Sequence, residues 1–426
     1  LGTPFPFDEK WIIEPISDST IYPAYYVISK YVNEGKIRNE EMNDEFFDYV
    51  FLGIGKEKNE IWKKIREDFI YWYPVDINLG GKEHKTVHFP VFIMNHVAIF
   101  PPEFYPKGIF VNWWITQKQG KISKSKGGAE PIPDAAKIYG VDAMRLYYAN
   151  ASSPFVDLEW QSSTVEQYKR RIIKLYQQFN ELINLNGKEK EVDRWLESAF
   201  NKKLKEAMDA MNEFDLRKAS MIIFFDIPSI FSWYVKREGE ASIIKFLKKW
   251  IAMMAPFTPH IAEEMWEKIS NGLVSLENFP QYGEIDEKII KAEEVLIKTI
   301  EDIEEIRKVT GIKGEKIYIY VASEWKWKIA EIATEIKREG KFDIKKLFEK
   351  AKEMGIDMRE ASKFISKIAE EVKKEEFFYI DEKNYFENAK DFIEKELNAK
   401  VEIYREDELK EKRKDAMPYR PAIYIE

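Results

Sequence analysis

A short basic segment is the part of this sequence whose residue types point most directly to chemistry. Residues 120–128 read Gly-Lys-Ile-Ser-Lys-Ser-Lys-Gly-Gly, in a chain of 426 residues with a net charge of -8. Ammonium groups must stay in water or meet an anion, because burying an unpaired charge is costly. Since glycines make both ends of the segment mobile, its three lysines can close over a polyphosphate and stabilise the charge that grows as pyrophosphate leaves. A solvated surface turn is the alternative interpretation.

Two glycines ahead of an expected helix form the second candidate cluster, in the stretch Val-Asp-Ile-Asn-Leu-Gly-Gly-Lys-Glu-His of residues 75–84. Gly80 and Gly81 carry no Cβ, so a planar ring and a ribose can approach the backbone there. Glu83 stands at the mouth of the helix, where a carboxylate can accept hydrogen bonds from ribose hydroxyls. The pattern is typical of a nucleotide site.

Four histidines are available as metal ligands or proton carriers. His84 and His88 are four residues apart and therefore share one face of the expected helix. Two imidazoles can begin a metal site, but the sequence offers no evident third ligand, so we expect no metal and assign both to the lining of the site or to the core. His96 and His260 are expected to be structural for the same reason.

A parallel sheet is needed to position these clusters. The sequence from residue 71 to residue 140 contains a short run to Leu79, the glycine pair, an apolar helix from about Glu83 to Phe100 and a strand over residues 108–114. Strand, helix and strand in this order predict a parallel α/β unit. The basic segment is expected to follow the second strand directly, at the carboxyl edge where open α/β sheets bind ligands.

Helical patterns dominate the rest of the chain. In residues 1–75, Asp18, Ser19 or Thr20 is expected to cap a helix that has Pro23 in its first turn. Apolar residues at spacings of three and four predict a bundle over residues 165–270. A helix ending near Thr310 and three short strands predict a separate small α/β domain; the strands cover residues 316–322, 400–404 and 422–426.

Composition narrows the class of protein. The chain has no cysteine, which excludes a disulfide framework and thiolate metal sites and favours a reducing compartment. No apolar run approaches the length that spans a bilayer, so we expect a soluble cytoplasmic protein without a membrane partner. The sequence opens with Leu1 instead of methionine, from which we expect a fragment, a processed product or one half of a split protein.

Four segments resemble one enzyme family. Residues 121–125, Lys-Ile-Ser-Lys-Ser, resemble the K-M-S-K-S signature of class I aminoacyl-tRNA synthetases, with isoleucine in place of methionine. Residues 80–84, with His88 beyond them, resemble the G-G-x-E-H-x-x-x-H segment of leucyl-tRNA synthetases, and residues 253–266 resemble a stretch of their helical tRNA-binding domain. The carboxyl-terminal region is similar to the archaeal and eukaryotic branch. The resemblance spans essentially the whole chain.

This resemblance implies functional residues. Nine of them would bind ATP, with Lys121 and Lys124 also serving catalysis: Gly80, Gly81, Glu83, His84, Lys121, Ile122, Ser123, Lys124 and Ser125. Residues 18–22 resemble the D-S-S-W-Y segment that lines the leucine pocket, so Ser19 and Tyr22 are expected to bind leucine, whereas Thr20 and Ile21 depart from the pattern. A capped amphipathic helix is the alternative for this stretch. Mg²⁺ is expected with ATP, without a metal site on the protein.

The implied fold class is α/β plus all-α, in four regions. They are a connective region with the leucine-pocket helix (1–75), the second half of a Rossmann-type catalytic core (76–164), a helical-bundle tRNA-binding domain (165–283) and a small α/β carboxyl-terminal domain that also binds tRNA (284–426). In the bundle, the cations expected to touch tRNA phosphates are Lys169, Arg170, Arg171 and Lys174, with a solvated helix face as the alternative.

Two parts of the family pattern are missing from this sequence: the H-x-G-H signature and the inserted editing domain. The resemblance therefore implies a carboxyl-terminal part of a leucine–tRNA ligase that needs the amino-terminal half, as well as tRNA(Leu) and leucine, for catalysis. A noncatalytic paralogue that binds tRNA or acts as a scaffold is the alternative. A nucleotidylyltransferase acting on a small molecule is a third hypothesis, which the long helical region argues against.

Overall fold

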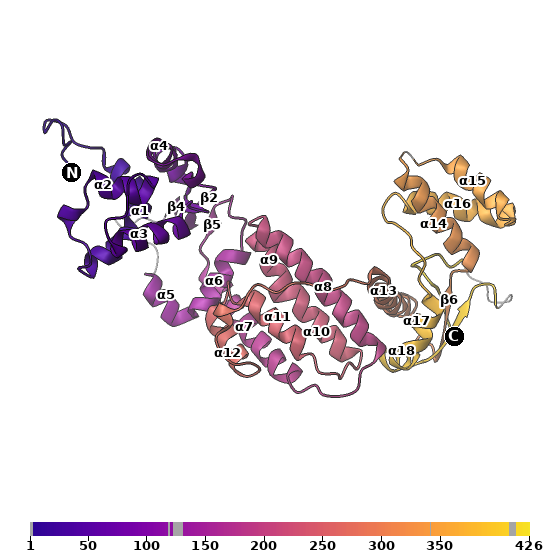
Figure 1. The fold of residues 1–426 in the computed structure, drawn as a ribbon. Coiled ribbons are helices and arrows are strands. Elements are labelled where there is room, and N and C mark those ends of the chain that lie inside the picture. The colour runs from indigo at the N-terminus through magenta and orange to yellow at the C-terminus, as the bar shows by residue number, and fades with distance from the viewer. Residues whose placement is uncertain (1–2, 118–119, 122–130, 341, 409–414) are drawn as a thin grey trace. The chain divides into compact units, whose positions relative to one another are not determined.

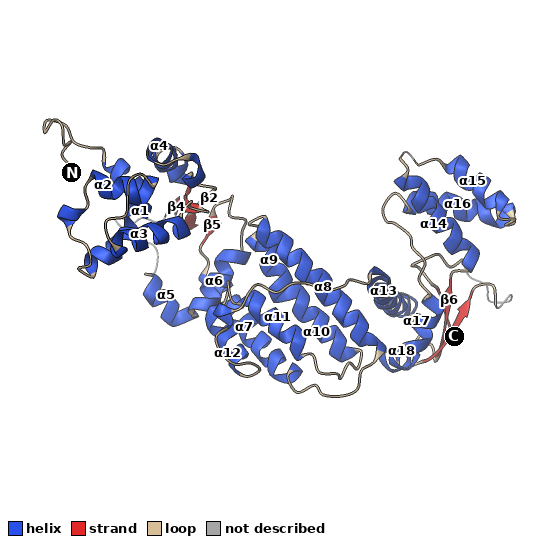
Figure 2. Ribbon diagram, in the orientation of Figure 1, coloured by secondary structure: helices blue, strands red, loops and turns tan. Residues whose placement is uncertain are grey.

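The computed structural model describes residues 3–117, 120–121, 131–340, 342–408 and 415–426 (Figure 1). The chain divides into two compact units. Leu1–Lys169 with Asp215–Arg217 form the first, and Arg170–Phe214 with Lys218–Glu426 form the second. Helices make up most of the described chain, and the strands are short (Figure 2). In the described residues, no helix is both long enough and apolar enough to cross a bilayer.

The first unit begins with a small helical layer around an aromatic core. Its core side chains include Ile28, Phe46, Trp62 and Phe69, all buried. Phe69 stacks on Tyr73, with ring centroids 4.5 Å apart. The elements of this layer are α1 (Pro15–Asn33), η1 (Asn39–Glu41), α2 (Asp44–Phe47), η2 (Asp48–Leu52) and α3 (Glu60–Trp72).

Helix α1 starts earlier than the sequence predicts. Glu14 is its N-cap and accepts a hydrogen bond from the amide of Ile16 at 2.6 Å, while Pro15 supplies the first helical position. The prediction of a cap at Asp18, Ser19 or Thr20 was therefore wrong, because a carboxylate followed by proline already starts the helix. Pro23 consequently lies inside the helix, not in its first turn.

The predicted parallel unit is present. Strand β1 (Asn78–Gly81) pairs in parallel with β2 (Ile109–Asn112), and α4 (His88–Ile99) connects them. The expected single helix over residues 83–100 is divided, however, since η3 (Lys82–Lys85) is a separate 3₁₀ turn that ends before α4 begins. The short η4 (Pro102–Phe104) precedes β2.

A second small sheet follows β2. Strand β3 (Ile115–Gln117) pairs antiparallel with β4 (Gly120–Lys121) and in parallel with β5 (Leu158–Glu159). The basic segment therefore does not follow the predicted strand directly, because β3 intervenes and the segment opens as β4. Between β4 and β5 lie α5 (Ile132–Tyr139) and α6 (Val141–Asn150).

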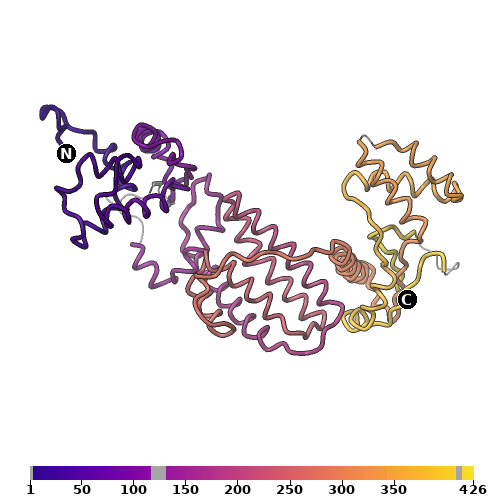
Figure 3. Tube along the Cα trace, viewed as in Figure 1, coloured from indigo at the N-terminus to yellow at the C-terminus, as the bar shows by residue number. Residues whose placement is uncertain are grey.

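The helical region of the second unit confirms the predicted bundle. Its helices carry apolar faces that pack on one another, and α8 and α10 lie side by side (Figure 3). Trp250 is fully buried and donates from Nε1 to the carbonyl of Ile223 at 2.8 Å. The elements are α7 (Ser162–Leu182), whose first residues belong to the first unit, α8 (Glu191–Asn212), α9 (Leu216–Met221), η5 (Ile222–Asp226), α10 (Ile227–Lys236), α11 (Ile244–Met254), α12 (Pro259–Glu267) and η6 (Val274–Leu276).

The carboxyl-terminal strands form one sheet, as predicted, with the order β7-β6-β8. Strand β6 (Lys316–Val321) is central; β7 (Lys400–Arg405) pairs with it in parallel and β8 (Ala422–Ile425) antiparallel. The helices of this region are α13 (Glu287–Thr310), α14 (Glu324–Arg338), α15 (Ile344–Glu353), α16 (Met358–Glu371), α17 (Glu382–Asn388) and α18 (Lys390–Leu397).

A buried carboxylate joins the bundle to this region. Glu293 of α13 is 0% exposed, and its Oε1 accepts from Trp233 Nε1 of α10 at 2.6 Å and from Nε of Arg237, the C-cap of α10, at 2.7 Å. Its Oε2 accepts from the hydroxyl of Tyr385 on α17. Burial, and then the charge of Glu293, raise the pKa of Tyr385, so the hydroxyl stays a donor at neutral pH. Helices α10, α13 and α17 thus meet at the carboxylate of Glu293.

Candidate active site

The glycine pair lies at the end of β1, where the backbone comes close to other groups. Gly80 and Gly81 are in register with Val111 and Asn112 of β2. A Cβ on Gly80 would stand 2.8 Å from His84 Nδ1 and 2.8 Å from Phe89 Cζ. The amide of Gly81 donates to the same His84 nitrogen at 3.2 Å. The missing side chain at Gly80 therefore gives room to an imidazole and a phenyl ring, which the sequence did not reveal.

Glu83 is held by an indole. Its Oε2 accepts a hydrogen bond from Trp114 Nε1 at 2.7 Å, which orients the carboxylate. Lys82 stands over the same aromatic pair, with its ammonium 5.0 Å from the ring centroid of Trp113 and 5.1 Å from that of Trp114. These contacts tie the glycine turn to the chain that leaves β2.

The start of the basic segment lies close by in the same unit. Lys121 is in register with Thr116, two residues beyond the Trp114 that holds Glu83. The backbone of Lys121 is thus linked to the glycine turn by the pairing of β3 with β4 and by the hydrogen bond from Trp114 to Glu83. Four of the residues expected to bind ATP lie outside the described residues: Ile122, Ser123, Lys124 and Ser125.

The tryptophan pair is the part of this site that sequence reasoning missed. The sequence predicts Trp113 and Trp114 only as the end of a strand, whereas β2 ends at Asn112. Two adjacent tryptophans after a strand could have indicated this contact, since a partly buried indole N–H usually donates to a hydrogen-bond acceptor such as a carboxylate. Glu83 was the nearest acidic residue in the other cluster.

His84 lies in η3 and His88 begins α4, so the prediction that the two histidines share one face of a helix was wrong. The rings of His84 and His88 lie 5.3 Å apart although they belong to different elements, and burial, followed by the charge of His84, lowers the pKa of His88. Within the described ranges, no group of three histidine or acidic side chains can hold a metal ion. His96 is fully buried, contacts the carbonyl of Phe92 at 2.8 Å and the Tyr73 hydroxyl at 3.2 Å, and is structural.

The expected leucine-binding residues lie on α1. The Ser19 hydroxyl donates to the Ile16 carbonyl at 3.0 Å, within its own helix. Tyr22 is 41% exposed and makes an edge contact with Tyr26, with centroids 4.9 Å apart. Thr20 is instead the buried member of this stretch and accepts from Asn95 Nδ2 of α4 at 2.7 Å.

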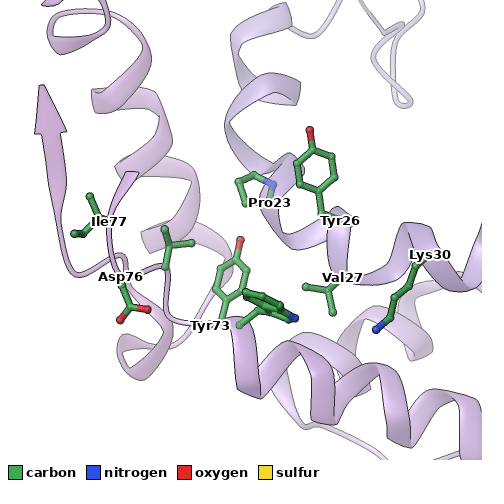
Figure 4. A pocket seen from close by; sticks show the side chains of 9 residues that line it. Pro23, Tyr26, Val27, Lys30, Tyr73, Asp76 and Ile77 are labelled. Atoms are coloured by element: carbon green, nitrogen blue, oxygen red, sulfur yellow. The ribbon is translucent and has the colours of Figure 1, made fainter. Parts of the chain in front are cut away.

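A pocket of about 600 Å³ opens beside α1 (Figure 4). Its lining residues come from α1 and from the chain between α3 and β1: Pro23, Tyr26, Val27, Lys30, Trp72, Tyr73, Val75, Asp76 and Ile77. Ser19 and Tyr22 are not among them, although Tyr26 connects Tyr22 to the pocket. Most of the lining is apolar, and its two charged groups have partners, since Lys30 pairs with Asp68 at 2.5 Å and Asp76 with Lys107 at 2.8 Å. The pocket is therefore suited to a small, largely apolar group.

One cation of the bundle has an internal role. Arg171 donates from both Nε and one terminal nitrogen to the carbonyl of Phe224, at 2.9 and 2.6 Å, and stacks over the Phe225 ring at 4.9 Å. Its guanidinium is thus engaged inside the bundle. Lys169 donates to the Ile138 carbonyl at 2.9 Å. Lys174 is exposed on α7.

The chain matches two protein-family models, one in each of two successive regions. Residues 58–186 match a family model for class I tRNA synthetases (M), and residues 193–320 match one for the anticodon-binding domain of tRNA ligases. Among curated proteins, leucine–tRNA ligase of Pyrococcus horikoshii is 39% identical over 460 aligned positions, which cover 100% of this chain and 47% of the relative. Leucine–tRNA ligase of Methanocaldococcus jannaschii is 38% identical over 444 positions with the same coverage.

A solved ternary complex of an Agrobacterium radiobacter LeuRS with tRNA and LeuAMS matches 51% of this chain and 29% of that chain, with 21% identity and a TM-score of 0.43. The chain spans about half the length of the curated relatives it matches. Leucine–tRNA ligases are therefore homologues of this chain over its whole length, at 38 to 39% identity, and its two domain matches are to models of tRNA synthetases and tRNA ligases.

Proposed function

We propose that this chain is the carboxyl-terminal part of a cytoplasmic leucine–tRNA ligase and works together with an amino-terminal half that carries H-x-G-H. The similarity of the whole chain to leucine–tRNA ligases is the observation that carries the proposal. In the complete enzyme the leucine carboxylate attacks the α-phosphorus of ATP, which gives leucyl-adenylate and pyrophosphate. The terminal adenosine of tRNA(Leu) then attacks the activated carbonyl and releases AMP.

The glycine turn is proposed to receive the adenosine. Gly80 and Gly81 present backbone without side chains, His84 packs against Gly80, and the Glu83 carboxylate accepts from a ribose hydroxyl. The Trp114 hydrogen bond supports this role because it orients the carboxylate before the nucleotide arrives. This cluster is proposed to bind and orient the adenosine.

The basic segment is proposed to meet the phosphates. Lys121 and Lys124 stabilise the negative charge that develops on the leaving pyrophosphate, Ser123 and Ser125 donate hydrogen bonds to phosphate oxygens, and Ile122 keeps an apolar position. The register of Lys121 with Thr116 supports this assignment, because it starts the segment beside the glycine turn. Mg²⁺ is proposed to bind through the phosphates of ATP.

Leucine is proposed to bind next to α1, with Ser19 and Tyr22 on the helix face that continues to Tyr26 and the 600 Å³ pocket. The bundle is proposed to lie along tRNA, which the match to an anticodon-binding domain supports. Lys174 remains a candidate for a phosphate contact, whereas the interior contacts of Arg171 argue against that residue.

Leucine-dependent ATP–pyrophosphate exchange tests the proposal, measured on this chain with and without the amino-terminal half of a matching synthetase. We expect exchange only when both parts are present. Binding of tRNA without exchange by the assembled pair would favour the noncatalytic paralogue and overturn the catalytic assignment.

Lys124→Ala, made in the assembled enzyme, should slow leucine-dependent exchange by tenfold or more while leucine affinity changes little, because the ammonium acts on charge that develops after leucine is bound. Lys137→Ala, an exposed lysine of α5, is the matched control. Equal exchange rates for Lys124→Ala and the parent would refute the role of this lysine.

A further inference from the structure

The indole of Trp114 contacts two groups of opposite charge beside the glycine turn. Its Nε1 donates to Glu83 Oε2 at 2.7 Å, and the Lys82 ammonium stands 5.1 Å from the centroid of its ring. The face of an indole is negative and its N–H is positive, so an ammonium over the face and a carboxylate at the N–H are both favourable. Two successive residues of η3 thus hold a side chain from a distant part of the sequence.

The backbone that carries this indole is tied down on both sides. The amide of Trp114 donates to Asp157 Oδ1 at 3.2 Å, and its carbonyl accepts from the amide of Leu158 at 2.9 Å. The amide of Trp113 donates to the Pro154 carbonyl at 2.9 Å. All three bonds run to the segment that leads into β5 and through its first residue. A donor on a supported backbone holds its partner more precisely than a donor on a free loop does, so Trp114 is a fixed reference point for the carboxylate.

Gly81 gives the carboxylate of Glu83 its place against the turn. A Cβ added at Gly81 would stand 2.8 Å from Glu83 Oε2, 3.1 Å from Cδ and 3.2 Å from Oε1. The carboxylate therefore rests where any other residue would put a side chain. Glu83 is exposed, and an exposed glutamate has many rotamers available to it. The indole and the glycine together select one of them.

A carboxylate held in this way can select for a hydroxyl on a ligand. A carboxylate offers about four lone-pair sites, so one group can accept from an indole and from a ribose hydroxyl together. A site that accepts from a hydroxyl discriminates against an analogue that lacks it, because the acceptor then loses a partner. A mobile glutamate would discriminate less, since it would lose side-chain freedom when the nucleotide binds.

We propose that Trp114 is a positioning residue that, together with Lys82, holds Glu83 for a ribose hydroxyl and so makes the site select ribonucleoside over deoxyribonucleoside triphosphates. The inference rests on the proposed function, which places the adenosine at the glycine turn. It deepens that function by assigning two residues outside the nine expected to bind ATP, and by assigning the site a preference between substrate classes.

The test is isothermal titration calorimetry of ATP, 2′-deoxy-ATP and 3′-deoxy-ATP with this chain assembled with the amino-terminal half. The parent should bind ATP more tightly than at least one of the two analogues. Trp114→Phe keeps an aromatic ring but removes the N–H, and should reduce this preference by about tenfold, the worth of a hydrogen bond to a charged group. Lys82→Met should reduce it by less, because the backbone bonds of Trp114 remain.

A double variant separates positioning from packing. If Trp114 acts through Glu83, Trp114→Phe/Glu83→Gln should lose no more of the preference than Glu83→Gln alone. Trp11→Phe, at an indole 67% exposed in the same unit, is the matched control and should keep the parent preference. Thermal unfolding checks that the variants keep the fold. Additive losses in the double variant, or equal losses of affinity for ATP and both analogues in Trp114→Phe, would overturn the proposal.

Leucine-dependent pyrophosphate exchange by the same assembled pair separates this inference from the proposed function. Binding of ATP with a ribose preference that falls in Trp114→Phe, but without exchange by the parent, would contradict the ligase assignment and leave this inference standing. Exchange by the parent, with a ribose preference that Trp114→Phe does not change, would contradict this inference alone. Absence of any nucleotide binding by the parent pair would overturn both.

Discussion

Removing the counterion of Glu293 should loosen the junction between the bundle and the carboxyl-terminal region. The carboxylate is 0% exposed, and the Arg237 side chain, 10% exposed, is the cation that pairs with it at 2.7 Å. In Arg237→Met the charge stays buried with only two neutral donors, Trp233 and Tyr385. Loss of one partner of a buried pair costs about 3–5 kcal/mol, far more than the pair contributes when intact.

Native-state hydrogen exchange of α13 and α10 measures this loss where it occurs, since a chain of two units does not give one unfolding transition. An opening free energy lower by about 3–5 kcal/mol raises the exchange rate of protected amides by roughly 160- to 5,000-fold. The double variant Arg237→Met/Glu293→Gln should recover much of the protection, because the amide oxygen of a neutral glutamine can accept from Trp233 while its NH2 group donates to the Tyr385 hydroxyl oxygen.

An exposed ion pair provides the matched control. Arg338 pairs with Glu376 at 2.6 Å, with the two side chains 63% and 45% exposed, so Arg338→Met should cost less than about 1 kcal/mol. The reasoning fails if Arg237→Met and Arg338→Met increase exchange equally, or if the double variant is no better protected than Arg237→Met.

Two further predictions concern stability. Gly80→Ala should lower the melting temperature of the first unit more than Gly81→Ala does. A Cβ added at Gly80 would lie 2.8 Å from the buried Phe89 ring, whereas a Cβ added at Gly81 would contact only the carboxylate end of Glu83. Equal melting temperatures of the two variants would contradict this. Burial raises the pKa of Glu382 to about 8, above its unfolded value, so the stabilisation from its protonated form is complete below about pH 4.5 and is lost as pH rises to about 8. In Glu382→Gln, the free energy of unfolding measured with urea should no longer decline across this pH range. An unchanged pH profile in the variant would refute the assignment.

The sequence predicted elements well where a hydrophobic period continued without interruption. The alternating run of β6 and the long amphipathic run of α13 were found at nearly their observed ends. The pairing of β8 antiparallel to β6 was not predictable, because strand direction depends on how the intervening chain returns to the sheet. The break between η3 and α4 was missed for a local reason: Glu83 and His84 bond to Trp114 and Gly81 instead of joining the helix face.

For the site, residue types were more informative than positions. The glycine pair, Glu83 and His84 do meet in one turn, and β4, the start of the basic segment, pairs with β3 near them. What the sequence did not reveal was the partner of each group, such as the indole that holds Glu83 or the carbonyl that engages Arg171. Such partners come from contacts between distant segments, which no local pattern records. The roles of Ser19, Tyr22 and Lys124 stay predictions.

The middle strand of the carboxyl-terminal sheet has a consequence for biosynthesis. A ribosome releases β6 well before it makes β8, and domains fold as units while the chain emerges. Until β8 arrives, one backbone edge of β6, with its buried Ile317 and Ile319, is open to any other nascent strand. A product truncated before β8 would therefore keep this edge exposed and prone to aggregation, and a chaperone that shields it would be needed until β8 is made.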